Sequence, residues 1–108
     1  GDKYVLLIPQ ELRQKFSEFL SKDSMIMSSI GKAMTEKIDM REVNYIIDTV
    51  KYEMRSSIDS LDSSLSSYNL TAQAAASARL ILDSIYRIAE YASDVGEALL
   101  NLAIEQFG

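Results

Sequence analysis

The chain of 108 residues contains no cysteine and no histidine. Their absence excludes disulfides, thiolate catalysis, zinc sites built from cysteine and histidine, and the most common general base. The many serines have no histidine to activate them, and no Gly-x-Ser-x-Gly turn is present. We therefore expect a protein that is not an enzyme. The lack of cysteine also fits a reducing, cytoplasmic location, which we expect for this chain.

Proline and glycine are scarce, with one and four residues, which favours long helices over a fold of strands and turns. The longest apolar run, YVLLI at residues 4–8, is five residues long. Neither a signal peptide nor direct membrane insertion is therefore expected.

Basic residues are outnumbered, eleven against sixteen acidic ones, giving a net charge of −5. This charge disfavours nucleic-acid binding through the domain, because phosphates require a basic face.

The composition that remains is 47% apolar and 25% charged, which is typical of one globular domain. Residues 1–8 stand apart, because the chain opens without methionine and YVLLI has the composition of a strand. We interpret them as an N-terminal arm or as the remnant of an upstream domain. Residues 9–108 are expected to form a single domain.

Apolar spacing predicts three long helices in residues 9–108. The first begins at Pro9, which suits the first turn of a helix, and the SKDS sequence at residues 21–24 is expected to bend or briefly break it. Asp39 with Glu42 three residues later forms a capping box, so the second helix begins there. Thr71 is the N-cap of the third, which extends over about 36 residues, or roughly 55 Å.

The second helix passes through a serine-rich stretch. Serine occupies seven of the twelve positions from 56 to 67, a composition that also suits a flexible linker. The apolar steps continue through the stretch, however, and favour a serine-rich helix. These steps are Val43, Ile47, Val50, Met54, Ile58, Leu61, Leu65 and Tyr68.

The third helix has an apolar arc centred opposite its charged side. The members of the arc are Ile81, Ile85, Ile88, Ala92, Val95, Leu99 and Ala103. Further apolar residues, Leu80, Leu82, Leu100 and Ile104 among them, widen the arc beyond a coiled-coil seam and indicate contact with two helices or with a partner chain. We predict an all-α, antiparallel up-down-up three-helix bundle that pairs into a homodimer.

Five charged residues, Asp83, Arg87, Glu90, Asp94 and Glu97, follow one stripe of the third helix at steps of four and three. Carboxylates four residues apart can share a hard cation, and Glu90 with Asp94 has that spacing. Spacing alone favours the other interpretation, a solvated face with ion pairs through Arg87.

The run LDSIYRIAEYASDVGEAL, residues 82–99, resembles the hallmark of the PhoU family of phosphate-uptake regulators. That family carries a Glu-Arg-Ile-Gly/Ala-Asp-x-Ala-x-Asn/Asp-Ile-Ala-Glu type run on the last helix of a three-helix repeat of about a hundred residues. The matching residues are Arg87, Ile88, Ala89, Ala92, Asp94, Val95 and Glu97. The resemblance covers about a sixth of the chain closely, and the chain has room for one repeat where family members usually carry two.

The resemblance implies a metal site on the bundle surface, formed by a Glu-x-x-x-Asp motif. In this chain the first position of that motif is Tyr86 and the second is Glu90. The expected ligands are therefore Glu90 and Asp94, helped by Asp83. Because no histidine is present, all ligands are oxygens, and iron, manganese, magnesium or calcium is expected rather than zinc.

The resemblance also implies a regulator that binds protein partners, a phosphate transporter or its sensor kinase, in the control of phosphate transport. The alternative is a generic helical dimerisation or adaptor domain of a larger protein, with no role in phosphate uptake. No residue of the chain identifies the partner.

Overall fold

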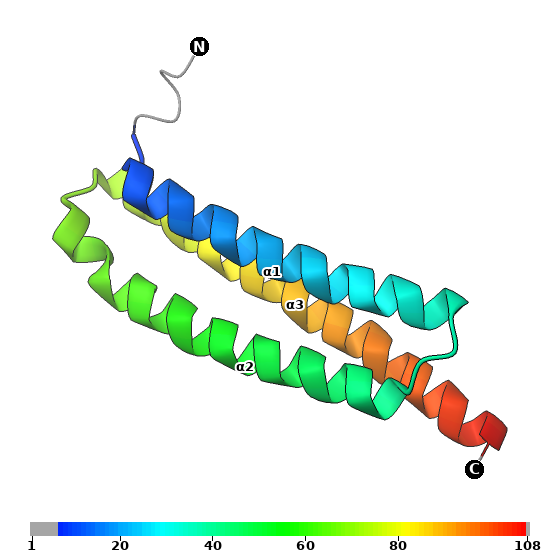
Figure 1. The fold of residues 1–108 in the computed structure, drawn as a ribbon. Coiled ribbons are helices and arrows are strands. Elements are labelled where there is room, and N and C mark those ends of the chain that lie inside the picture. Colours follow the sequence, from blue (N-terminus) through cyan, green and yellow to red (C-terminus); the bar gives the residue numbers. More distant parts are fainter. Residues whose placement is uncertain (1–6, 108) are drawn as a thin grey trace.

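The structure, a computed structural model, describes residues 7–107 and confirms the all-α three-helix bundle. Helix α1 (Gln10–Thr35) and helix α3 (Ala72–Phe107) run in one direction, and α2 (Met40–Ser64) runs in the other (Figure 1). A short 3-10 helix, η1 (Leu65–Tyr68), follows α2, and residues 7–107 contain no strand. Most of the predicted N-terminal arm lies outside the described residues.

The predicted starts of α2 and α3 are confirmed by their caps. The Asp39 carboxylate accepts a hydrogen bond from the backbone N–H of Arg41 at 2.9 Å, and the Thr71 hydroxyl accepts one from the N–H of Ala74 at 3.1 Å. The end of α2 differs from the prediction, because the helix tightens into η1 instead of continuing to Tyr68. The turn after η1 places Asn69 at φ 52°, a left-handed conformation that asparagine tolerates better than most residues.

The expected bend at residues 21–24 is wrong, since α1 is continuous from Gln10 to Thr35. Asp23 does not interrupt the apolar pattern but occupies one of its positions. It is buried on the same face of α1 as Phe19 and Ile26, at spacings of four and three. A carboxylate thus occupies a core position of the bundle.

The core consists of the inward faces of all three helices. From α2 and η1 it takes the predicted apolar steps, of which Val50 and Tyr68 are half-buried. From α3 it takes Leu82, Ile85 and Ala89, so the buried sector is rotated from the predicted arc, and Val95 is 41% exposed.

This rotation changes the predicted dimer surface of α3. Leu82 is only 2% exposed and belongs to the core of its own bundle. Leu80 and Leu100 are twenty residues apart, about 200° around the helix, and therefore lie on opposite sides. These residues do not form one face, although other apolar residues of α3 are exposed.

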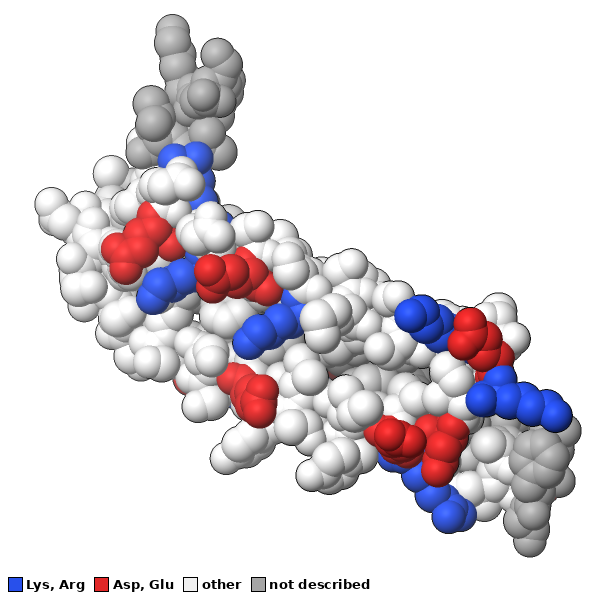
Figure 2. All heavy atoms as spheres, in the orientation of Figure 1, with Lys and Arg blue, Asp and Glu red and all other residues white. Residues whose placement is uncertain are grey.

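Acidic and basic side chains are interspersed on the face drawn in Figure 2, with wide uncharged areas between them. This face carries no continuous basic stripe of the kind that binds a phosphate backbone. Within residues 7–107, no helix combines the length and apolarity needed to cross a bilayer.

Candidate functional site

The charged stripe of α3 is exposed, and its members are not gathered into one site. Asp83 pairs with Arg87, its carboxylate 2.9 Å from the guanidinium, while Glu90 and Asp94 face solvent. In the described part of the chain, no three acidic side chains converge on a point that could hold a metal ion. A site made of Asp83, Glu90 and Asp94 together is therefore not preformed. A weak site at Glu90 and Asp94 stays a prediction.

A groove between α2 and α3, with a volume of about 620 Å³, is bordered by Asp94 and Glu97 on one side and Asp48 on the other. Ser93 lies between the two helices, where its hydroxyl donates to Asp48 at 3.2 Å and accepts from Lys51 at 3.5 Å. These contacts join α2 to α3.

Gly96 allows α2 and α3 to approach closely at this groove. Its carbonyl accepts a hydrogen bond from the Asn44 side chain at 3.0 Å. A Cβ atom at Gly96 would overlap the Asn44 side-chain oxygen and lie 3.5 Å from Ile47. Gly31, in contrast, has no atom within 4 Å of an added Cβ.

Replacing each of these two glycines by leucine is therefore expected to have opposite effects on the free energy of unfolding. Gly96→Leu should lower the free energy of unfolding by about 2 kcal/mol, because the side chain overpacks the α2–α3 contact. Gly31→Leu should raise it by about 0.5–0.8 kcal/mol, because leucine is the better helix former at an open position. Urea denaturation followed by circular dichroism measures both. A loss of similar size in the two variants would contradict the close approach at Gly96.

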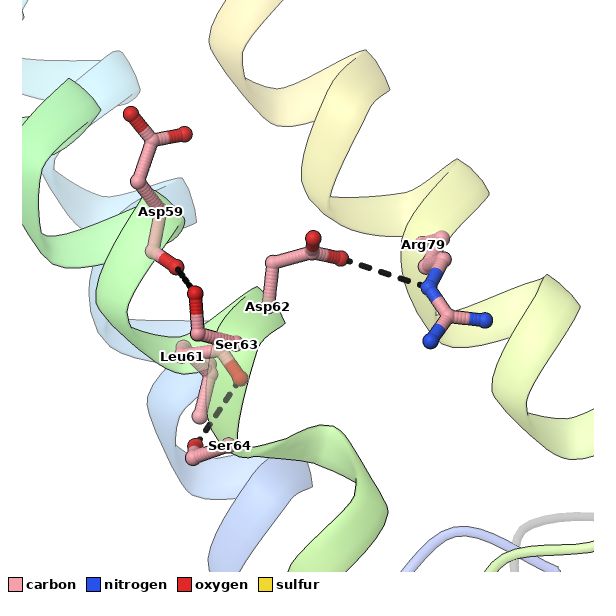
Figure 3. Close-up of polar contacts among 6 residues, drawn as sticks. All are labelled: Asp59, Leu61, Asp62, Ser63, Ser64 and Arg79. Carbon is pink, nitrogen blue, oxygen red and sulfur yellow. Dashed lines mark hydrogen bonds and ion pairs between the residues drawn. The ribbon is translucent and has the colours of Figure 1, made fainter.

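Two hydroxyls at the serine-rich end of α2 donate to carbonyls of the same helix (Figure 3). Ser63 donates to the carbonyl of Asp59 at 3.0 Å and Ser64 to that of Leu61 at 2.9 Å. Asp62, from the same turn, crosses to α3 and pairs with Arg79 at 3.5 Å. The stretch is a helix, as predicted, and not a flexible linker.

A second groove, between α1 and α3, is almost wholly apolar and has a volume of about 310 Å³. We call it the α1–α3 groove. Its lining residues are Met27, Ile30, Ile88, Tyr91, Ala92 and Val95. Met27 is 51% exposed and Tyr91 67% exposed, so large apolar side chains border the groove in contact with solvent.

Exposed apolar residues extend the α1–α3 groove along both helices. On α1, Leu20 and Met34 lie seven residues before and after Met27. On α3, Leu80 and Leu102 lie eleven residues before and after Tyr91, three helical turns away on the same side. The breadth of the apolar arc on α3 indicated contact with two helices or with a partner chain, but the sequence did not show that α1 contributes the other wall.

Comparison with protein-family models, with curated proteins and with solved structures gave no match. The family resemblance therefore depends on residues 82–99 alone. In the structure these residues form the middle of α3, where Tyr91 and Val95 line the α1–α3 groove and Asp94 borders the α2–α3 groove.

Proposed function

We propose that this chain is a non-enzymatic regulatory domain similar to PhoU proteins, and that it acts in the control of phosphate transport by binding a partner protein. The resemblance of residues 82–99 and the order of three helices support the phosphate role. The observation that carries the binding role is the α1–α3 groove, since exposed apolar patches bordered by polar residues mark interaction sites.

The occupant that fits this groove is the apolar face of an amphipathic helix from the partner, laid along α1 and α3. One charge near the groove favours a basic flank on that helix. Asp94, three residues after Tyr91, is exposed, and no basic residue pairs with it in the described range. A helix with lysine or arginine along this flank would complement it.

The proposed binding predicts a selective loss of affinity. Tyr91→Asp combined with Val95→Asp should weaken binding to the cytoplasmic parts of the phosphate transporter or its sensor kinase at least tenfold, because charges enter the apolar groove. Biolayer interferometry with the purified partners measures the affinity. Tyr45→Asp is the matched control, since Tyr45 is 73% exposed and lines neither groove.

Wild-type protein that binds neither partner at micromolar concentration would contradict the phosphate role. Equal binding by wild type and the Tyr91/Val95 variant would contradict the groove as the surface. The rival function, a dimerisation or adaptor domain without a phosphate role, is favoured by the same exposed apolar side chains. Light scattering that shows a dimer in wild type and a monomer in the Tyr91/Val95 variant would support that rival if the wild-type protein also binds neither phosphate partner.

In this proposal a metal ion binds only weakly at the surface. Glu90 and Asp94 are its ligands, and water or a second chain completes the coordination. Calorimetry with iron, manganese, magnesium or calcium at millimolar concentration should show binding. Glu90→Gln combined with Asp94→Asn should abolish it and leave the helicity unchanged. Absence of heat for all four metals with the wild-type protein would end the metal hypothesis.

A further inference from the structure

Asp23 is the one charged residue buried in the described part of the chain, with 1% of its surface exposed. Neither carboxylate oxygen has a hydrogen-bond partner. An unpaired carboxylate in an apolar core is costly in its charged form, and natural cores rarely keep one without a role. The Asp23 carboxylate has no role in the function proposed above.

The polar contacts between helices are distributed unevenly. Helices α2 and α3 are joined by Asn44 to the Gly96 carbonyl, by Ser93 to Asp48, and by the Asp62–Arg79 ion pair (Figure 3). Helix α1 makes one such contact in the described range, from the Tyr68 hydroxyl to Glu11 at 3.3 Å. Apolar packing therefore holds α1 to the rest of the bundle, while α2 and α3 form a hairpin with polar links as well.

Helix α1 is also weak as an isolated helix. Its N-cap residue, Pro9, provides no side-chain hydrogen bond. Gly31 lies within the helix, and the hydroxyls of Ser21 and Ser29 bond back to carbonyls one turn earlier. These features lower the local stability of the helix that carries the unpaired carboxylate.

We propose that α1 is a releasable helix, whose separation from the α2–α3 hairpin is favoured when Asp23 ionises. In the closed bundle the carboxylate is removed from water, and in the open form it is hydrated, so its charge favours opening. The open form exposes the apolar inner faces of α2 and α3. This release of α1 goes beyond the groove described above and does not depend on a phosphate role.

The charges around Asp23 do not offset its burial. On α2, Lys51 is half-buried and directed to Ser93, and the other charged residues are exposed. On α3 every charged residue is exposed, and the half-buried titratable group is Tyr86, whose ring faces Arg55. The half-buried charges of α1 itself are Arg13, Lys15 and Lys22. None of these groups forms a hydrogen bond or ion pair with Asp23.

Hydrogen exchange of the intact chain, resolved by helix with mass spectrometry at pH 5 and pH 7, tests the proposal. Burial raises the pKa of Asp23 from 3.8 to about 6. After correction for intrinsic exchange rates, the opening constant of α1 should then be about tenfold larger at pH 7 than at pH 5. Buried amides of α2 and α3 should be more protected than those of α1 at pH 7.

Two variants of α1 separate the role of Asp23 from a general effect of pH. Asp23→Asn keeps the shape but cannot ionise, so the α1 opening constant should be equal at the two pH values. Glu18→Gln removes an exposed carboxylate from the same helix and should keep the tenfold change. The proposal is overturned if all three helices share one opening constant, or if Asp23→Asn retains the pH dependence of wild type.

Discussion

Replacing Asp23 by leucine is expected to raise the free energy of unfolding at pH 7 by about 3 kcal/mol. The wild-type carboxylate is 1% exposed and lacks a hydrogen-bond partner, so its ionised form is desolvated without compensation. Its pKa is raised from 3.8 to about 6 by this burial. At about 1.4 kcal/mol for each pKa unit, the shift corresponds to roughly 3 kcal/mol at neutral pH.

The sign of the pH dependence follows from the same shift. Well below pH 3.8 Asp23 is protonated in the folded and the unfolded protein, and it imposes no ionisation penalty. As the pH rises from about 4 to about 6, the unfolded chain releases the proton first, so the free energy of unfolding falls. Above pH 6 the penalty is constant. The advantage of Asp23→Leu should therefore be about 2 kcal/mol smaller at pH 4 than at pH 7.

Urea denaturation at the two pH values measures this difference, with Glu18→Leu as the control on the exposed side of α1. The control should change the free energy of unfolding by less than about 0.5 kcal/mol at either pH. A lower stability of Asp23→Leu than of wild type at pH 7 would show that the Asp23 carboxylate has a favourable partner in solution.

Replacing Ile85 by alanine should lower the free energy of unfolding by about 2–5 kcal/mol. Ile85 is 3% exposed and belongs to the part of α3 that packs into the core. The loss combines the transfer free energy of the removed methyl and methylene groups with the cavity that remains among the three helices. Leu61→Ala, at a 5% exposed position of α2, should have an effect in the same range.

Ser60→Ala is the matched control on α2, one residue before Leu61 and exposed. It should change the free energy of unfolding by no more than roughly 0.5 kcal/mol. Thermal and urea denaturation of the three variants measure the contrast. A comparable loss in Ser60→Ala and Leu61→Ala would show that the faces of α2 are placed incorrectly.

The sequence by itself determined the three helices and most of the inward face of α2. Asp39 and Thr71 cap their helices because short polar side chains satisfy free N–H groups, an interaction within a few residues of chain. The inward face of α2 follows from its apolar spacing, because a single narrow seam leaves one way to bury it. The resemblance of residues 82–99 was also visible in the sequence, together with the acidic pair Glu90 and Asp94.

Only the tertiary structure decided which sector of α3 is buried and what surrounds Asp23. The apolar arc of α3 is wider than the contact with two neighbouring helices, so periodicity alone did not show that Leu82 is buried and that Tyr91 and Val95 border a groove. Asp23 continues the spacing of Phe19 and Ile26, yet a carboxylate is expected on the surface because of its hydration. Packing of α1 on both other helices overrides that preference, since turning Asp23 to solvent would also expose the apolar residues of the same face.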